Sequence, residues 1–482
     1  MTLLAPLLIP LVTALLAAVL GQRPRVQANV SLGGGLVLLL AAGTLLRDVT
    51  ATGPQTAALG NWPLPYAIAL AADGLSALLV LVAAALAVAV LLFARGWRES
   101  ADMPGLHPLL HGLLAACCAV FLAADLFNLY VWFELMLIAM LGLLALGGKP
   151  LHAEAALKYF VLSMLGTLLM LAAVGLLYGA TGHLNFAALR EAAGQPALAA
   201  AVPGYVALLA LAVLLKAGAF PLFAWLPASY HTLPAPVLAF VGGLLTKVAA
   251  YVLLRLLGDV FVTTPAALLD ALGWLAAATM VIGVLGAAYH WDVRRILAFH
   301  IVSQIGYLLL GIALASPAGA AGTAFFLIHN ILVKANLFLI AGLMFASAGH
   351  YDLRRIGGLY PTRPLLALLF LVSAFSLVGV PPSSGFWGKF MLVREAFAQA
   401  HYAWGGIALA VGLLTLYSMS KIWAEAFWKP APHAENSAAA ALPRSALAGV
   451  ALMTLLIVAM GIHPEPFIRH LEAATAHFWR AG

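Results

Sequence analysis

Apolar segments long enough to cross a lipid bilayer follow one another along almost the whole of this 482-residue chain. A transmembrane helix needs about 20 predominantly apolar residues. Fourteen segments meet that criterion, near residues 3–20, 28–46, 73–94, 107–124, 128–147, 156–179, 204–225, 235–257, 266–289, 296–315, 319–347, 364–397, 403–426 and 444–462. Because 64% of the residues are hydrophobic and 9% are charged, little is left for a water-soluble domain. We therefore predict an all-α integral membrane protein with about 14 transmembrane helices, in which residues 1–482 form one transmembrane domain.

The cations between these segments predict the orientation, because cytoplasmic loops carry an excess of Lys and Arg. With the N-terminus outside, 13 cations fall on the inner side: Arg23, Arg25, Arg95, Arg98, Lys149, Lys158, Arg294, Arg295, Arg354, Arg355, Arg363, Lys429 and Arg444. Six fall on the outer side: Arg47, Arg190, Arg255, Arg394, Arg469 and Arg480. The bias predicts both termini on the outer side. It also accounts for the net charge of +7 without nucleic acid as a partner.

Several kinds of chemistry have no signature in this sequence. The first apolar segment has no Lys or Arg ahead of it, which favours an uncleaved helix over a signal peptide. The two cysteines, Cys117 and Cys118, are adjacent in an apolar run and indicate neither a disulfide framework nor a metal site. Neither a phosphate-binding loop nor haem spacing occurs. We expect no cofactor, no metal and no enzymatic activity, so the chain exchanges one gradient for another or is driven by partner subunits.

Two predicted spans contain helix breaks. The segment from Pro364 to Phe397 has about 34 residues, which as one helix is roughly 50 Å long and exceeds the bilayer core. Pro381 and Pro382 lie in its middle and remove backbone donors there. The seventh span has Pro221 five residues after Lys216. Broken helices in matching positions indicate an internal repeat and a transport site.

Four lysines, Lys216, Lys247, Lys334 and Lys389, each lie near the middle of a separate apolar segment. An ammonium at that depth is costly, and the default interpretation is a proton or ion path. Lysine suits such a path because burial readily changes its protonation, whereas arginine stays charged. The alternative is that these lysines only fix helix packing.

Glu134 is the only carboxylate within the fifth span. A nearby carboxylate favours the charged form of a buried lysine, whereas desolvation favours the neutral form. A Glu and a Lys whose separation changes would therefore make a switchable proton donor. The alternatives are a structural ion pair or a carboxylate that faces water near the surface.

Two further polar positions are open to more than one interpretation. His329 precedes Lys334 by five residues, which places the two side chains about 140° apart around one helix. His329 is either a proton relay near neutral pH or a packed core residue, and the sequence leaves both open. Lys421 lies nearer a span end, and with Glu425 one turn later it is expected to be mainly structural.

Five segments resemble one family. They are 125–144 (DLFNLYVWFELMLIAMLGLL), 216–227 (KAGAFPLFAWLP), 245–251 (LTKVAAY), 294–306 (RRILAFHIVSQIG) and 381–390 (PPSSGFWGKF). In these segments the chain resembles the antiporter-like subunits shared by respiratory NADH:quinone oxidoreductase and the Mrp-type cation/proton antiporters. The resemblance covers nearly the whole chain and is strongest to the D-type subunits of the Mrp group.

The resemblance implies fourteen transmembrane helices, with two inverted five-helix repeats and broken helices 7 and 12. It suggests core repeats at about 107–257 and 266–426, with flanking helices in 1–106 and 427–482. It further implies that Glu134 modulates Lys216 and that protons pass through Lys216, Lys247 and Lys389 along ordered water. His329 and Lys334 match the positions that link the two halves. Some respiratory members have glutamate where this chain has Lys389, so the lysine disfavours those members.

The leading hypothesis is therefore a proton-translocating subunit of a multi-subunit Na⁺/H⁺ antiporter in a bacterial inner membrane. Its expected partners are the other subunits of a hetero-oligomeric complex, the lipid bilayer, H⁺ and Na⁺, with K⁺ left open as the cation. The alternative is a proton-pumping subunit of a redox-driven complex such as a quinone oxidoreductase or a membrane-bound hydrogenase. A third hypothesis is a membrane scaffold that transports nothing.

Overall fold

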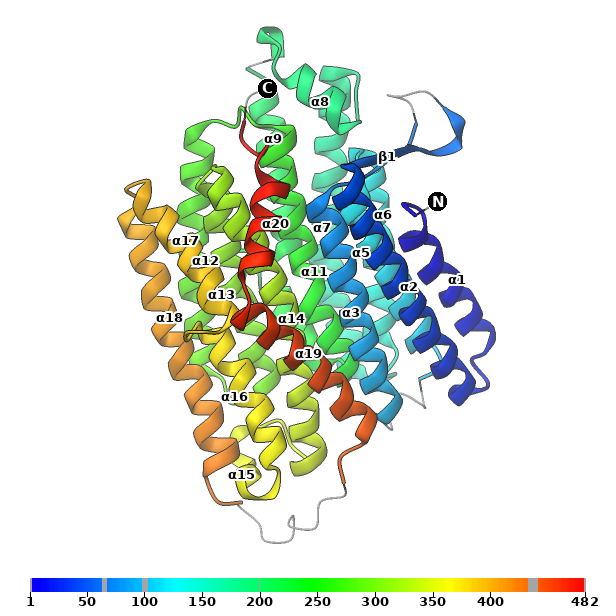
Figure 1. Ribbon diagram of the computed structural model, residues 1–482, viewed down its shortest axis with the longest axis vertical. Helices are drawn as coiled ribbons and strands as arrows, with labels where there is room; N and C mark the ends of the chain where they lie inside the picture. The colour runs from blue at the N-terminus through cyan, green and yellow to red at the C-terminus, as the bar shows by residue number, and fades with distance from the viewer. Residues whose placement is uncertain (1, 63–66, 98–102, 199, 432–440, 481–482) are drawn as a thin grey trace.

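The computed structural model describes residues 2–62, 67–97, 103–198, 200–431 and 441–480. It is a bundle of helices, most of which run along the longest axis of the molecule (Figure 1). Within these ranges, ten helices are long and apolar enough to cross a membrane. Four shorter apolar helices coincide with other predicted spans: Ala5–Val19, Leu106–Leu122, Val202–Ala217 and Pro364–Val378. The all-α membrane fold is confirmed, and the count of fourteen spans stays a prediction. Arg98 of the cation count lies outside the described residues.

The N-terminal flank consists of three helices and one hairpin: α1 (Ala5–Val19), α2 (Pro24–Thr52), β1 (Gln55–Ala58), β2 (Ala69–Ala72) and α3 (Gly74–Gly96). The strands pair antiparallel at the upper end in Figure 1. Asp73 follows β2 and caps α3, because its carboxylate accepts a hydrogen bond of 2.8 Å from the backbone N–H of Ser76. This cap places an acidic side chain beside the hairpin.

The next helices make up the first predicted repeat: α5 (Leu106–Leu122), α6 (Leu126–Ala145), α7 (Pro150–Thr181), α8 (Phe186–Ala193), α9 (Val202–Ala217), α10 (Trp225–Ser229) and α11 (Ala235–Arg255). A π-helical turn, Leu256–Val260, extends α11. Asp125 caps α6 by accepting hydrogen bonds of 2.9 Å from the N–H groups of Phe127 and Asn128.

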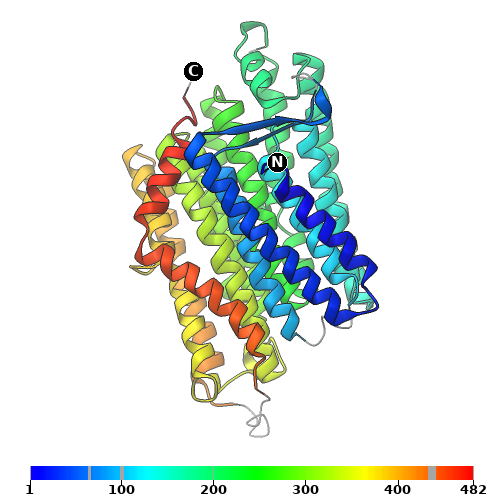
Figure 2. The same cartoon turned by 45° about the vertical axis from the view of Figure 1, so that its right-hand side comes forward.

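The following helices make up the second predicted repeat: α12 (Ala266–Tyr289), α13 (Val293–Ala313), α14 (Pro317–Ala348), α15 (Leu359–Thr362), α16 (Pro364–Val378), α17 (Ser384–Ala398) and α18 (Tyr402–Ile422). Asp292 caps α13 by accepting a 2.8 Å hydrogen bond from the N–H of Arg294. The C-terminal helices are α19 (Arg444–Ile462) and α20 (Glu465–Thr475), which pack against α3 and α14 (Figure 2).

Matching backbone bridges occur in the two halves. Asp125 pairs with Asn185, and Asp292 pairs with Asp352. The first bridge precedes α8 at the upper end in Figure 1, and the second lies near α15 at the lower end. Equivalent features at opposite ends are what inverted repeats require. The repeat boundaries at 107–257 and 266–426 stay predictions.

Both predicted helix breaks are present. The first follows Ala217, where Gly218 has φ +75°, and the second follows Val378, where Gly379 has φ +92°. Glycine is the residue that adopts these backbone angles without a Cβ clash. Helical structure resumes at Trp225 and Ser384. Lys216 therefore lies just before one break, and Lys389 lies in the helix that follows the other.

The buried centre of the bundle is formed by α11, α13 and α14, which are covered along most of their length. α14 packs against α11, and close approach is possible because Gly243 faces it: a Cβ there would lie 3.1 Å from the carbonyl oxygen of Ile331. The start of α1 and the C-terminal residues lie in the same half of the molecule (Figure 1). The four lysine-bearing helices contact one another in turn, α9 with α11, α11 with α14 and α14 with α17.

Candidate functional site

Glu134 of α6 and Lys216 of α9 are connected through a third residue. Thr167 of α7 donates a hydrogen bond of 2.7 Å to Oε1 of Glu134. Its hydroxyl accepts a hydrogen bond of 3.0 Å from Nζ of Lys216. Among the described residues, no carboxylate lies within ion-pair distance of Lys216. Thr167 therefore connects Glu134 to Lys216 indirectly.

The surroundings of Lys216 are aromatic and contain a small cavity. Its Nζ lies 5.1 Å from the ring centroid of Phe133. Beside it is a cavity of about 30 Å³, lined among others by Tyr159, Ser163 and Trp225. Such a volume has room for at least one water molecule, and hydroxyl groups on its wall offer hydrogen bonds. The ammonium of Lys216 thus has a hydroxyl and an aromatic ring as neighbours, and no carboxylate pairs with it directly.

Lys247 lies at the centre of α11 and is fully buried. Its Nζ donates a hydrogen bond of 2.7 Å to the carbonyl oxygen of Gly242 in the preceding turn. The side chain therefore points toward the start of α11. This geometry leaves two ammonium hydrogens for other acceptors, which suits a group that exchanges partners.

Buried polar side chains lie along the centre of the bundle, on α11, α13 and α14. Side-chain atoms of these residues have no hydrogen-bond partner within the described part of the chain: Thr246, His300, Ser303, Gln304, Asn330 and Lys334. Buried polar groups are normally paired with protein or with ordered water. We therefore infer that the centre of the bundle holds internal water. Lys334 is near enough to Lys247 and to Lys389 to interact electrostatically with both.

Lys389 reaches back across the second break. Its Nζ donates hydrogen bonds to the carbonyl oxygens of Leu377 (3.0 Å) and Val378 (2.8 Å). These carbonyls are at the C-terminus of α16, where intrahelical partners are missing and a cation is favoured. The ammonium also lies 4.9 Å from the ring centroid of Tyr307. Lys389 thus stabilises the broken helix as well as carrying a charge into the membrane.

His329 belongs to a short chain of hydrogen bonds at the same break. Its Nδ1 lies 2.9 Å from the hydroxyl of Ser384, which lies 2.9 Å from the hydroxyl of Ser376. The other ring nitrogen, Nε2, is buried and has no partner among the described residues. The imidazole is therefore hydrogen-bonded through one ring nitrogen and unpaired at the other among the described residues.

The partners of Lys421 differ from the expected pairing with Glu425. Its Nζ donates hydrogen bonds to the carbonyl oxygens of Ala288 (3.0 Å) and His290 (2.7 Å) at the end of α12. Glu425 instead forms an ion pair of 2.8 Å with Lys429. Helix-end carbonyls form a stronger site for this ammonium than a partly exposed carboxylate one turn away.

Sequence reasoning found the lysines and missed several residues that join them. The sequence alone assigns no role to Thr167, His300, Gln304 or Ser384. Their common signal is a polar side chain inside an apolar span, which is weaker than a charge because hydroxyl and amide groups are tolerated in membrane helices. Within the described ranges, no group of three or more His, Cys, Asp or Glu side chains is arranged to hold a metal ion.

Residues 123–416 match the model of the family described as NADH:quinone oxidoreductase/Mrp antiporter, transmembrane. That stretch contains Glu134, the four buried lysines and both helix breaks. This chain belongs to that family. The resemblance given by the five sequence segments is thereby confirmed.

Two relatives within the NADH:quinone oxidoreductase/Mrp antiporter family are similar over their whole length. The D-type subunit of the Na⁺/H⁺ antiporter of Alkalihalophilus pseudofirmus is 37% identical over 96% of this chain and 94% of its own. The D-type subunit of the Na⁺/H⁺ antiporter of Bacillus subtilis is 36% identical over 95% of this chain and 93% of its own.

Solved structures of the family share the fold. A chain of the Mrp complex from Dietzia sp. has a TM-score of 0.89 at 29% identity, covering 99% of this chain and 97% of that chain. A chain of respiratory complex I from Thermus thermophilus has a TM-score of 0.86 at 27% identity, covering 99% of both. The family fold accounts for essentially every described element.

Proposed function

We propose that this chain is the proton-translocating subunit of a multi-subunit Na⁺/H⁺ antiporter. The observation that carries the proposal is a series of lysines inside the membrane helices α9, α11, α14 and α17, of which Lys247 and Lys334 are fully buried. Buried hydroxyl, imidazole and amide groups lie on α11, α13, α14 and α17. The full-length likeness to the D-type subunits of two Na⁺/H⁺ antiporters supports the same function.

The proposed proton path begins at the Glu134, Thr167 and Lys216 group. A proton on Lys216 passes to Lys247 and then, through internal water and Lys334, to Lys389. The electrostatic interactions of Lys334 with both Lys247 and Lys389 support its place between them. His329 offers a second connection to the break beside Lys389, through Ser384. Lysine can cycle between charged and neutral forms, which arginine cannot do here.

Glu134 is the proposed modulator of Lys216. When Glu134 is ionised and connected through Thr167, it favours the protonated lysine. Rotation of the Thr167 hydroxyl breaks that link and favours release of the proton toward Lys247. The switch therefore needs a side-chain rotation and no rearrangement of helices.

The exchanged cation is proposed to be Na⁺, with K⁺ as the alternative. Hard cations prefer several oxygen ligands together, and within the described residues no group of three or more His, Cys, Asp or Glu side chains is arranged to hold a metal ion. We therefore place the cation site on or beside a neighbouring subunit of a hetero-oligomeric complex. In the proposed orientation, both termini are on the outer side of a bacterial inner membrane.

The test is cation-induced collapse of a pH gradient in inverted vesicles from antiporter-deficient bacteria that express the complete operon. Addition of Na⁺ should dissipate the gradient with the wild type and fail with Lys216→Ala at equal expression. A matched control is Lys158→Ala, because Lys158 is exposed and pairs with Glu154 away from the path.

Each result has a distinct meaning. No cation response by the wild type, combined with a gradient that requires an electron donor and the partner subunits, would favour the redox-driven alternative. An active Lys216→Ala variant would show that Lys216 is structural and would contradict the proposed path. A loss with Lys158→Ala equal to that with Lys216→Ala would show that the assay reports folding.

A further inference from the structure

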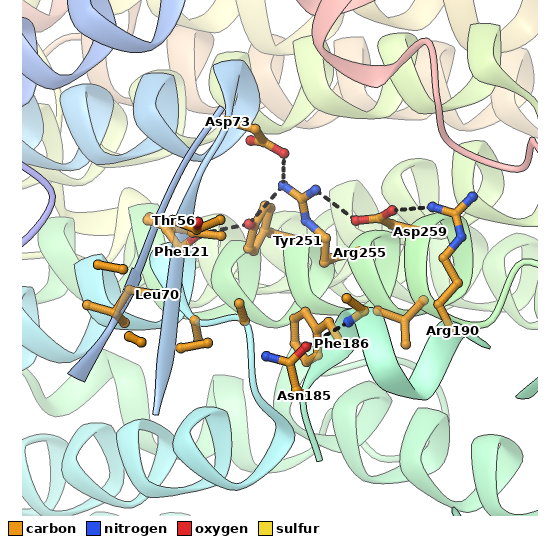
Figure 3. Close-up of a pocket in the computed structure, with 18 residues that line it drawn as sticks. Thr56, Leu70, Asp73, Phe121, Asn185, Phe186, Arg190, Tyr251, Arg255 and Asp259 are labelled. Atoms are coloured by element: carbon orange, nitrogen blue, oxygen red, sulfur yellow. Dashed lines mark hydrogen bonds and ion pairs between the residues drawn. The ribbon is translucent and has the colours of Figure 1, made fainter. Parts of the chain in front are cut away.

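A cavity of about 320 Å³ lies at the end of the molecule that the proposed orientation places outside. It is bounded by the β1–β2 hairpin, by Asn185 to Ala187 at the start of α8, and by the end of α11 (Figure 3). Tyr251 and Arg255 of α11 both line it. The helix that carries Lys247 therefore forms part of the cavity wall.

Lys247, Tyr251 and Arg255 occupy successive turns on one face of α11. Residues four apart on a helix lie on the same side and about 6 Å apart along the axis. Tyr251 is buried and donates a hydrogen bond of 2.9 Å to the carbonyl oxygen of Phe121, and it accepts one of 3.2 Å from Arg255. One helical turn thus separates the cavity wall from the fully buried Lys247.

Arg255 is fixed at this position by several interactions. Its guanidinium forms ion pairs with Asp73 (2.6 Å) and Asp259 (3.2 Å), and Figure 3 shows it between these two carboxylates. It also lies 5.1 Å from the ring centroid of Phe478 in the C-terminal segment. The side chain is only 11% exposed. These contacts come from three parts of the chain, so the guanidinium has little freedom to move away.

Asp259 is shared with a second arginine at the rim. Arg190 of α8 lies 3.2 Å from Asp259 and donates a hydrogen bond of 2.9 Å to the carbonyl oxygen of Arg480. Its side chain is 33% exposed, three times as much as that of Arg255. The two arginines therefore differ in position: Arg190 lies at the exposed rim, and Arg255 lies deeper in the cavity wall, next to Tyr251.

Tyr251 and Arg255 close the inner wall of the cavity, because the hydroxyl and the guanidinium are held by hydrogen bonds and ion pairs, and Lys247, one turn further along α11, is fully buried. We propose that Arg255, held over Tyr251, is a seal that prevents protons on the outer side from reaching Lys247 through this cavity. Asp73 and Asp259 are positioning residues that hold the guanidinium in place. Tyr251 occupies the space beneath it.

The seal has a clear purpose if Lys247 is part of the path, so the inference rests on the proposed function. A relay lysine with direct access to the outer side would let protons flow inward without cation exchange. The seal limits exchange with the outer side to the route through Lys389.

The experiment measures the passive decay of the pH gradient in inverted vesicles after respiration is stopped, with no Na⁺ added. In these vesicles the cavity faces the acidified interior. Arg255→Gln should speed the decay several-fold. Adding Lys247→Ala to that variant should restore the wild-type rate, because the leak passes through Lys247. Arg190→Gln should decay at the wild-type rate, because Arg190 lies at the rim. Asp73→Asn should decay faster than the wild type but more slowly than Arg255→Gln, because Asp259 still holds the guanidinium.

Four outcomes would overturn the proposal: a wild-type decay rate with Arg255→Gln at wild-type expression, a leak that persists without Lys247, an equal leak with Arg190→Gln, or a wild-type decay rate with Asp73→Asn. If Arg255→Gln does not accumulate, the double variant Asp73→Asn with Arg255→Gln replaces it. That variant leaves no uncompensated buried charge, so it is better tolerated, and it should leak as well. Sodium-driven exchange by Lys247→Ala alone is measured separately, and its retention would contradict the proposed function without bearing on the passive leak.

Discussion

Lys216 donates its hydrogen bond to Thr167, and this hydroxyl separates the ammonium from the carboxylate that is expected to control it. A direct ion pair would hold the proton on Lys216 by strong charge attraction. A hydroxyl bridge weakens that attraction and can be broken by one bond rotation. The first prediction concerns this bridge.

Thr167→Val removes the hydroxyl and keeps the shape of the side chain. Hydrogen bonds to charged groups contribute about 1.5–3 kcal/mol, so we expect the sodium-driven exchange rate to fall by about tenfold or more. The rate is measured in inverted vesicles at matched expression. Thr167→Ser keeps the hydroxyl and should stay within about threefold of the wild type. Equal rates for Val and Ser would contradict the bridging role.

Lys389→Arg separates the structural role of this residue from its transport role. Arginine can still bond the carbonyl oxygens of Leu377 and Val378 and keep the positive charge, so the protein should accumulate normally. Because arginine does not release its proton, exchange should fall to background. Lys389→Ala should lose both exchange and thermal stability. Normal exchange by the arginine variant would show that Lys389 does not carry protons.

Gly385→Ala tests the packing at the second break. A Cβ at this position would lie 1.8 Å from the carbonyl oxygen of Ser376 and 2.9 Å from Cε1 of His329. Overpacking of this kind costs about 1–3 kcal/mol. We expect a lower unfolding temperature in detergent and weaker exchange.

The matched control for Gly385→Ala is Gly406→Ala on α18. A Cβ at Gly406 meets no atom within 4 Å, so alanine should be neutral or slightly stabilising there. Equal unfolding temperatures for the two variants would mean that α16 and α17 can separate without cost.

Asp125→Ala and Asp292→Ala remove the equivalent caps in the two halves. Each should destabilise the protein by about 1 kcal/mol, because each leaves backbone donors of one helix unpaired. Thermal unfolding of the purified protein measures the change. Asp270→Ala, which alters an exposed residue near the start of α12, should have no effect. A clear loss from only one cap would argue against equivalent roles in the two halves.

Sequence reasoning predicted the fold well, because the bilayer leaves few alternatives. A backbone in hydrocarbon must satisfy its own hydrogen bonds, so apolar segments of sufficient length become helices. The breaks near Lys216 and Lys389 were also predictable, since proline cannot continue the helical hydrogen bonds. The partner of Lys421 was not predictable, because the end of α12 lies far from it in sequence.

The sequence by itself determined that four lysines lie inside membrane helices and that two of these helices are broken, because local composition and proline chemistry decide both features. Only the tertiary structure decided what each lysine contacts. The bridge through Thr167, the carbonyls under Lys389 and the ion pairs of Arg255 all join residues on different helices or on opposite sides of a break. Hydropathy constrains how deep a side chain lies in the membrane. It carries no information about which neighbour faces that side chain, since this depends on how the helices pack and rotate against one another.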